Sequence, residues 1–398
     1  MTDSTNKQTK LWQDPNLLIV FSVTLIAIQG VASLTPAIPK IAQQLQITPR
    51  DIGLLITFFT LPGVFLTPVL GILADRYGRK RILAPSLIMF GLGGFACFFA
   101  RDFQLLLAFR FLQGVGAAAI GSLNITLIGD LYSGRNRAAA MGYNASVLST
   151  GTATYPVIGG ALATLGWYMP FLLPLLALPV AFLVLFHLKN PEPKSTEKLG
   201  QYLKNTWRHI MNRQVLGLFG VSLGTFILLY GVYLTFFPLL MDEQFHAPPF
   251  VIGLVMSTSS ISTAITSFQL GYLSKWFTQR TLMKIAFGFY GLTTVLVPFI
   301  HNIWLLLIPT VIFGVAQGLN MPSILTLLTG LAPMDQRAAI LSLNGTVLRL
   351  GQTLGPFIMG LVYALWQLNG VFVVGTILAI LLFVLVAFTL SPPKSGTE

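Results

Sequence analysis

The chain contains few charged residues and almost no cysteine. Asp, Glu, Lys and Arg make up 9% of its 398 residues, whereas a soluble domain contains roughly 25%. Together with 54% hydrophobic residues and a mean hydropathy of +0.77, this excludes a soluble globule and predicts a protein embedded in lipid. The single cysteine, Cys97, excludes a disulfide within the chain and is expected to be a small packing residue.

Sequence motifs for nucleotide or metal chemistry are also missing. The chain has no P-loop ending in Lys-Ser or Lys-Thr and no HExxH pattern. We therefore expect neither an enzyme nor a cofactor or metal site. The formal charge of +12 would suggest nucleic acid as the partner of a soluble protein, but its placement in loops argues for membrane topology instead.

Hydropathy divides the chain into segments of the length that crosses a bilayer. We expect an all-α integral membrane protein with twelve transmembrane helices, at about residues 16–38, 51–73, 82–100, 104–131, 138–163, 166–188, 214–241, 250–273, 281–300, 303–331, 338–364 and 366–390. Most Lys and Arg fall in the termini and in loops on the same side, so both termini are predicted to be cytoplasmic. A bacterial inner membrane is the expected location.

A long duplication runs through the chain. Residues 127–160 align without a gap to residues 327–360, two hundred positions later, and pair Arg137 with Arg337 and Pro156 with Pro356. A unit repeated in one orientation needs an even number of spans, which predicts two parallel six-helix repeats. The predicted parts are an N-terminal bundle over 1–188, a cytoplasmic linker over 189–213 and a C-terminal bundle over 214–398.

The loop after the second predicted span is short, basic and glycine-containing. Its residues Gly71, Asp75, Arg76, Gly78, Arg79 and Lys80 resemble the signature loop of the major facilitator superfamily. The resemblance covers the whole chain and implies twelve spans, two rocking halves and alternating access. It also implies that Asp75 faces the start of the eleventh span, that Arg79 meets Asp130, and that the loop stabilises the outward-open state. The corresponding C-terminal loop lacks the Asp.

Two further segments resemble motifs of the same family. Arg110, Gln113 and Gly114 in the fourth span resemble a motif linked to substrate or proton handling, while packing alone explains the nearby glycines. The fifth span resembles the antiporter motif of the exporters of the family. Its residues are Gly151, Pro156, Gly159 and Gly160, with Tyr155 where the motif has Gly.

Arg349 is predicted to lie deep in the membrane. It follows Arg337 by twelve residues, or about 18 Å of helix, and its counterpart in the first half is Ser149. An intramembrane cation usually faces a bundle interior or a water-filled cavity. We expect Arg349 to attract an anionic or strongly polar group of the substrate; the alternative is an Arg paired with carbonyls or water between helices.

Acids are absent from the middle of every predicted span, as are the four His. Intramembrane proton relays generally use Asp, Glu or His, so proton coupling would have to involve Asp130, Asp51 or the substrate itself. Further substrate contacts are sought among polar residues of the first, fourth, seventh and tenth spans, which line the cavity in the family that the chain resembles. These are Gln29, Asn124, Tyr230, Tyr233, Gln317 and Asn320.

The resulting functional prediction is a secondary transporter, expected to be monomeric, that exports a lipophilic or amphipathic small molecule by proton antiport. Its expected partners are the small-molecule substrate, protons and membrane lipid. One alternative is ion-coupled uptake of an organic anion or metabolite. An alternative of another class is a non-transporting membrane receptor.

Overall fold

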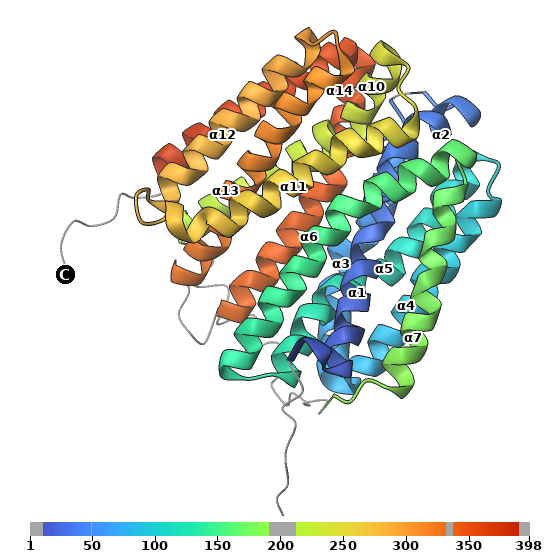
Figure 1. Cartoon of the computed structure of the whole chain (residues 1–398), viewed down its shortest axis with the longest axis vertical. Helices are drawn as coiled ribbons and strands as arrows, with labels where there is room; N and C mark the ends of the chain where they lie inside the picture. The colour runs from blue at the N-terminus through green and yellow to red at the C-terminus, as the bar shows by residue number, and fades with distance from the viewer. Residues whose placement is uncertain (1–10, 49, 191–211, 332–336, 390–398) are drawn as a thin grey trace, which may run out of the picture.

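The computed structural model describes residues 11–48, 50–190, 212–331 and 337–389, and in these residues the regular structure is entirely helical. Figure 1 shows the helices gathered into two bundles, the first built from the blue to green half of the chain and the second from the yellow to red half. The fold is therefore the all-α membrane architecture that the sequence predicts.

The first bundle begins with a short 3-10 turn, η1 (Leu11–Gln13). It continues with α1 (Pro15–Ala32), η2 (Thr35–Ala37), α2 (Ile38–Gln44), α3 (Leu54–Tyr77), α4 (Arg79–Phe99), α5 (Phe103–Leu131), α6 (Gly134–Leu165), η3 (Met169–Leu176) and α7 (Ala177–Phe186). The second consists of α9 (Arg213–Ile227), the π-helical η4 (Leu228–Phe236), α10 (Phe237–Phe245), α11 (Pro249–Leu273), α12 (Gln279–Leu296), η5 (Val297–Phe299), η6 (Ile303–Leu306), α13 (Leu307–Leu331) and α14 (Arg337–Thr389). The predicted linker over 189–213 lies mostly outside the described residues.

The described chain contains ten helices that are long and apolar enough to cross a membrane, so the predicted number of twelve is not confirmed as such. Two of the predicted spans lie within α14, whose 53 residues are two helices that meet at Gln367, a residue with non-helical dihedral angles (φ 54°). At about 1.5 Å per residue an unbroken helix of this length would be far longer than a bilayer core. Helix α6 is not among the ten, because glycines and small polar residues along its whole length keep its mean hydropathy low.

Local chemistry explains where several helices begin and end. Asp14 caps α1 by accepting a hydrogen bond from the Asn16 amide at 2.9 Å, and Pro15 occupies the first helical position. Gly78 separates α3 from α4 with φ 101°, a conformation that favours glycine. The Tyr132 hydroxyl donates to the Asp14 carboxylate at 2.8 Å. Burial and this bond raise the pKa of Tyr132.

The duplication extends beyond the aligned stretch, because contacts recur at the same offset of two hundred. A Cβ on Gly114 would lie 2.1 Å from the Phe59 carbonyl oxygen, and one on Gly314 would lie 2.2 Å from that of Ser259. The repeated spacing therefore also relates α3 and α5 to α11 and α13.

A second recurring contact supports the same relation. The hydroxyl of Thr67 donates to the Ala118 carbonyl at 2.8 Å, and that of Ser267 donates to the Gly318 carbonyl at 3.3 Å. Each residue of the second pair lies two hundred positions after the corresponding residue of the first pair. The offset can therefore be used to compare the two halves residue by residue.

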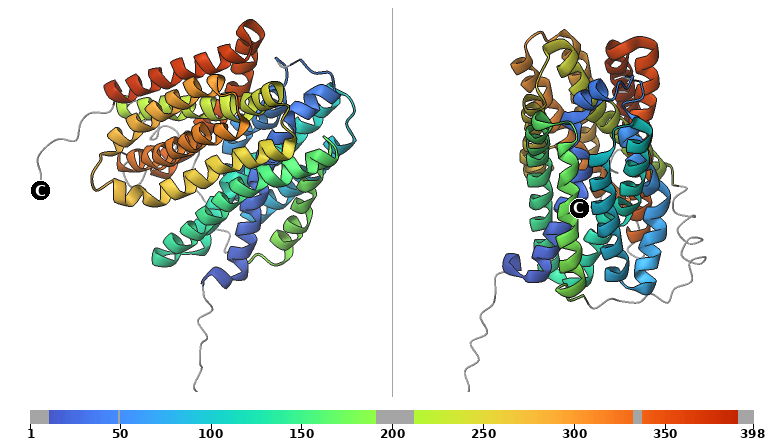
Figure 2. Two further views of the ribbon diagram at one scale, coloured as in Figure 1. Left: turned by 45° about the horizontal axis from the view of Figure 1, so that its top comes forward. Right: turned by 90° about the vertical axis from the view of Figure 1, so that its right-hand side faces the viewer.

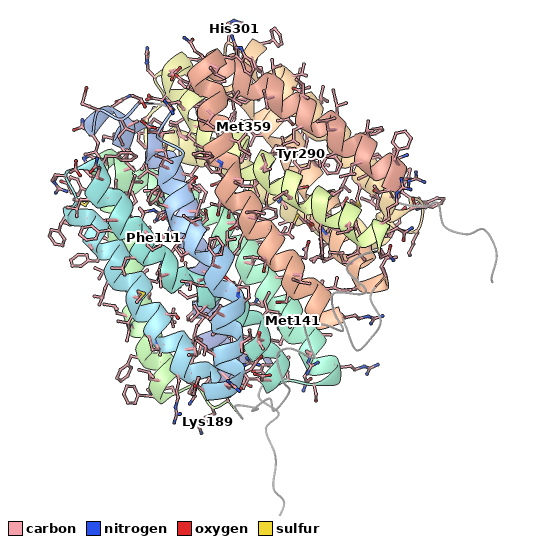
Figure 3. The ribbon with its side chains drawn as sticks, turned by 180° about the vertical axis from the view of Figure 1, so that it is seen from behind. Phe111, Met141, Lys189, Tyr290, His301 and Met359 are labelled. Atoms are coloured by element: carbon pink, nitrogen blue, oxygen red, sulfur yellow. The ribbon has the colours of Figure 1, made fainter. Side chains whose placement is uncertain are left out.

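The two ends of the molecule differ. The terminal end is the end of the molecule where α1 begins; it also contains Lys189 and the loops 77–79 and 273–279. The far end is the opposite end, which contains the loops 100–102 and 300–302. Figure 3 shows Lys189 and His301 at these opposite ends. In Figure 2 the bundles meet near α2 and α10 at the far end and diverge toward the terminal end.

Candidate functional site

The two halves meet at the far end through glycine residues packed on backbone carbonyls. A Cβ on Gly53 would lie 2.4 Å from the Pro356 carbonyl oxygen, and one on Gly253 would lie 2.2 Å from that of Pro156. These two contacts are related by the offset of two hundred. The far end is thus closed by a symmetric pair of contacts that only glycine permits.

The same helix faces are open toward the terminal end. Gly71 follows Gly53 by five helical turns and therefore lies on the same face of α3. Nothing lies within 4 Å of a Cβ on Gly71, on its counterpart Gly271, or on Gly345, which shares the Pro356 face of α14. A cleft between the halves therefore opens toward the terminal end and closes at the far end.

Polar contacts between the two halves also lie at the closed far end and in the part of the cleft next to it. At the far end the Gln43 amide donates to Asp242 at 2.7 Å. Further along, the Thr57 hydroxyl donates to the Thr353 carbonyl at 3.1 Å, and the Thr353 hydroxyl donates to that of Thr60 at 3.0 Å. These bonds hold α2 to α10 and α3 to α14.

The glycines and proline predicted as the antiporter-like motif lie at this closure. A Cβ on Gly159 would overlap the Ser33 carbonyl, and one on Gly160 would lie 2.3 Å from the Pro249 carbonyl oxygen. Pro156 contacts Gly253, as described above, whereas Gly151 packs on side chains of α1. The segment therefore joins α6 both to its own half and to α11.

The residues predicted as a gate loop form an ion-pair cluster at the terminal end. Arg79 donates through Nε to Asp130 at 2.9 Å and also pairs with Asp75. Arg79 is buried and Arg76 is exposed, while Lys80 lies in the first turn of α4. The predicted meeting of Arg79 with Asp130 is present, and it joins the start of α4 to the end of α5.

Arg110 is fully enclosed within the N-terminal half. Its Nε donates to the Leu55 carbonyl at 3.1 Å, and one terminal nitrogen donates to the Gly30 carbonyl at 3.0 Å and to Gln113 at 2.8 Å. The Phe59 ring lies 4.1 Å from the guanidinium carbon, a cation–π contact. Arg110 thus joins α1, α3 and α5 near the first turn of α3.

Several buried polar atoms near this cluster have no protein partner. They are both side-chain polar atoms of Gln29, the second terminal nitrogen of Arg110 and the amide nitrogen of Gln113. Buried polar groups are nearly always hydrogen-bonded, to protein or to ordered water. The predicted pair Arg110 and Gln113 is brought together, and Gln29 is adjacent to Gly30 in the chain.

Asn124 and Asn320 form hydrogen bonds inside their own halves. Asn124 donates to the Thr24 hydroxyl at 2.5 Å, and this hydroxyl donates to the side-chain oxygen Oδ1 of Asn144 at 2.5 Å. Asn320 donates to the Thr225 hydroxyl at 2.8 Å. Both are buried contacts between helices, so the structure assigns no shared pocket to these two predicted residues.

The remaining predicted residues of the C-terminal half gather around an aromatic cluster. The Tyr233 ring stacks on Phe313 at 4.2 Å, and Tyr290 meets Phe313 edge to face at 5.0 Å. The Tyr290 hydroxyl donates to Gln317. Tyr233 and Phe313 also line a small apolar pocket within this half. Tyr230 stacks on Phe226 at 5.8 Å.

Among the residues predicted as substrate contacts, Arg349 reaches from one half to the other. Its guanidinium lies against Gly63 of α3, and its terminal nitrogen is 3.5 Å from the Ala117 carbonyl of α5. The sequence predicts this residue but not its contact with Gly63, and it does not predict the hydrogen bond of Gln43 to Asp242.

Asp242 and Glu243 are two acids directly after an apolar segment. This position at the end of a predicted span is the sequence feature that could have indicated the far-end contact.

Among the described residues, no group of three or more His, Cys, Asp and Glu side chains is arranged to hold a metal ion. The site consists instead of a cleft between two helical halves, with a closed far end and an ion-pair cluster beside its open end. This is the geometry of a pathway for a solute rather than of a reaction centre.

Comparisons with known proteins agree with this geometry. The chain is 26% identical to the bacillibactin exporter of Bacillus subtilis over 96% of its own length and 98% of that protein. It is 27% identical to multidrug resistance protein 1 of the same organism, over 87% and 89% of the two chains. Among solved structures, the nucleoside transporter NupG superposes with a TM-score of 0.79 at 15% identity, over 94% of this chain and all of that one.

The family model of the major facilitator superfamily matches residues 20–242 and 221–398, which together span nearly the whole chain. The relatives have exporter and resistance names, and none of these findings points to an enzyme. The protein is a multi-pass membrane transporter and belongs to the major facilitator superfamily.

Proposed function

We propose that the protein exports a lipophilic or amphipathic small molecule from the cytoplasm by proton antiport. The observation that carries the proposal is the contact of the glycine and proline segment of α6 with α11, which closes the far end of the cleft. The exporter and resistance names of the relatives support the direction of transport.

The orientation is part of the proposal. Because Lys and Arg concentrate at the terminal end, this end is proposed to face the cytoplasm of a bacterial cell, across its inner membrane. The structure then represents the inward-facing state. Substrate enters from the cytoplasm or inner leaflet, and the halves rock about the middle of the membrane to release it outside.

Proton coupling is proposed to use groups at the ends of the helices or on the substrate. In the part of the chain that the structure describes, the acids near the helix ends include Asp51, Asp130 and Asp242. Asp130 already interacts with Arg79, and Asp242 with Gln43 across the halves. Protonation of either carboxylate would weaken a contact that holds one end of the transporter.

Reconstituted protein tests the proposal directly. Proteoliposomes with the pH dye pyranine inside receive a gradient of ethidium, N-phenyl-1-naphthylamine or anilinonaphthalene sulfonate, which are a cation, a neutral compound and an anion. Antiport predicts that probe influx alkalinises the interior, as protons leave. Acidification during influx would indicate symport and contradict the proposal, as would fluxes equal to those of protein-free vesicles.

The second candidate is uptake of an organic anion or metabolite by symport. The observation that favours it is Arg349, a cation between the two halves. The sign of the pH change in the same experiment distinguishes the two candidates. We propose a monomer in membrane lipid as the working unit in either case.

A further inference from the structure

We infer that the transported solute carries an anionic group and that Arg349 binds this group where α3, α5 and α14 meet. The inference rests on the proposed function, because it names the chemical class of the solute in the same cleft. A sulfonate, a carboxylate or an acidic phenol would fulfil this requirement on an otherwise apolar molecule.

The guanidinium of Arg349 packs against two glycine residues. A Cβ on Gly63 would lie 2.6 Å from one terminal nitrogen of Arg349 and 2.9 Å from its Cδ. A Cβ on Gly121 would lie 3.5 Å from the other terminal nitrogen. The long side chain therefore crosses from the C-terminal half onto α3 at Gly63, where a Cβ would force the guanidinium to shift, and it comes within ordinary contact distance of Gly121 on α5.

No protein group in the described residues neutralises this cation. The ion pairs there join Arg79 to Asp75 and Asp130, and none includes Arg349. The hydrogen bond of the guanidinium to the Ala117 carbonyl is long, at 3.5 Å. A partly buried cation in a membrane protein without a counter-ion favours an anionic ligand.

The internal repeat shows that this arrangement is specific to one side of the molecule. The residues two hundred positions away in the other half are different: Arg349 corresponds to Ser149, Gly63 to Thr263 and Gly121 to Met321. Three residues that lie together thus differ from their counterparts, although the contacts around them recur. The arginine and the two glycines beside it therefore occur in one half-to-half contact and not in the contact related to it by the repeat.

The open part of the cleft reaches this place. Gly345 precedes Arg349 by four residues and therefore lies on the same face of α14, and nothing is within 4 Å of a Cβ there. A solute that enters from the terminal end therefore meets the guanidinium at the inner limit of the open space. Charge-assisted hydrogen bonds from an Arg are among the stronger ones in proteins.

Two probes that differ only in charge test the inference. Anilinonaphthalene sulfonate and N-phenyl-1-naphthylamine share one ring skeleton, and only the first carries a sulfonate. Their binding is measured by fluorescence with the protein in nanodiscs of phosphatidylcholine, with empty discs as the blank. The protein variants are wild type, R349Q, R349K and G63A, with R101Q as a matched control because Arg101 is exposed at the far end.

We expect R349Q to weaken sulfonate binding about tenfold or more and to leave the affinity for the neutral probe within about twofold. R349K should bind the sulfonate with intermediate affinity, and R101Q should bind both probes as wild type does. G63A keeps the charge and displaces the guanidinium. It should therefore weaken sulfonate binding selectively, which keeps the test valid if the Arg349 variants fail to fold.

Three results would overturn the inference. Sulfonate binding that is unchanged in R349Q would do so, and equal weakening of both probes would indicate a purely structural residue. Wild-type protein that binds only the neutral probe would contradict the anionic solute while leaving the proposed export intact. Wild-type protein that neither binds nor transports any probe would contradict the proposed function as well.

Discussion

Gly53 lies directly on the carbonyl oxygen of Pro356, so close that a Cβ would be 2.4 Å from that oxygen. Its counterpart Gly253 lies in the same way on Pro156. The two contacts bring α3 onto α14 and α11 onto α6 at the far end. They are the clearest sign that the state of the molecule is set by glycine packing between the halves.

The first prediction concerns this closure. Gly53→Ala and Gly253→Ala each place a methyl group against backbone, which cannot move aside as a flexible side chain does. We expect both variants to open the far end and increase the distance between spin labels at Gln44 and Gln244, which are exposed on α2 and α10. Gly71→Ala is the control, because open space surrounds it. Unchanged distances in both closure variants would contradict this role.

The second prediction separates the two acids of the Arg79 cluster. The Asp130 side chain is 13% exposed and that of Asp75 is 44% exposed. We expect Asp130→Asn to lower stability by about 1–3 kcal/mol, because Arg79 is buried and loses a shielded partner. Asp75→Asn should cost about 1 kcal/mol or less. Thermal unfolding in detergent measures both, and an equal or reversed order would refute this ranking.

The third prediction concerns Arg110. Arg110→Lys keeps the charge but removes the fork that reaches the carbonyls of Leu55 and Gly30 and the Gln113 side chain. We expect a loss of about 2 kcal/mol or more, because buried acceptors are left without donors. Thermal unfolding again gives the measurement, and a variant as stable as wild type would show that these bonds are dispensable.

The fourth prediction concerns the ring over this guanidinium. Phe59→Leu conserves an apolar side chain but removes the aromatic face 4.1 Å from Arg110. We expect a loss of about 1–2 kcal/mol from the cation–π contact and the smaller side chain. In the Arg110→Lys background the loss should be smaller. A double-mutant cycle with additive losses would speak against coupling of the two residues.

Much of this architecture is predictable from the sequence. Hydropathy predicts long apolar helices, and the described chain contains ten of them, since lipid requires long apolar segments whose backbone bonds are satisfied internally. The duplication from Leu127 to Gly160 indicated the paired halves. The boundaries were less predictable. The helix starting at Pro15 continues through a 3-10 turn to Gln44, well beyond the predicted end at residue 38, whereas the predicted boundary between residues 364 and 366 lies close to the break at Gln367.

The site was predictable only where a residue is unusual in its own right. Arg110 and Arg349 stand out as cations in apolar segments, and Arg79 with Asp130 follows from the family resemblance. Asn124 and Asn320 do not stand out in this way, since an intramembrane Asn bonds equally well to a neighbouring helix. The contact of Arg349 with Gly63 depends on how two halves meet, which no local pattern contains.

The central claim is that the halves must move relative to each other to carry solute. Cysteines replacing Gln43 and Asp242, whose side chains are bonded across the halves at 2.7 Å, allow the far end to be locked by a short bis-methanethiosulfonate crosslinker in a background with Cys97→Ala. We predict that crosslinking abolishes probe flux in proteoliposomes and that reduction of the crosslink restores it, while each single cysteine variant is unaffected. Flux that continues at the wild-type rate through the locked protein would contradict the account.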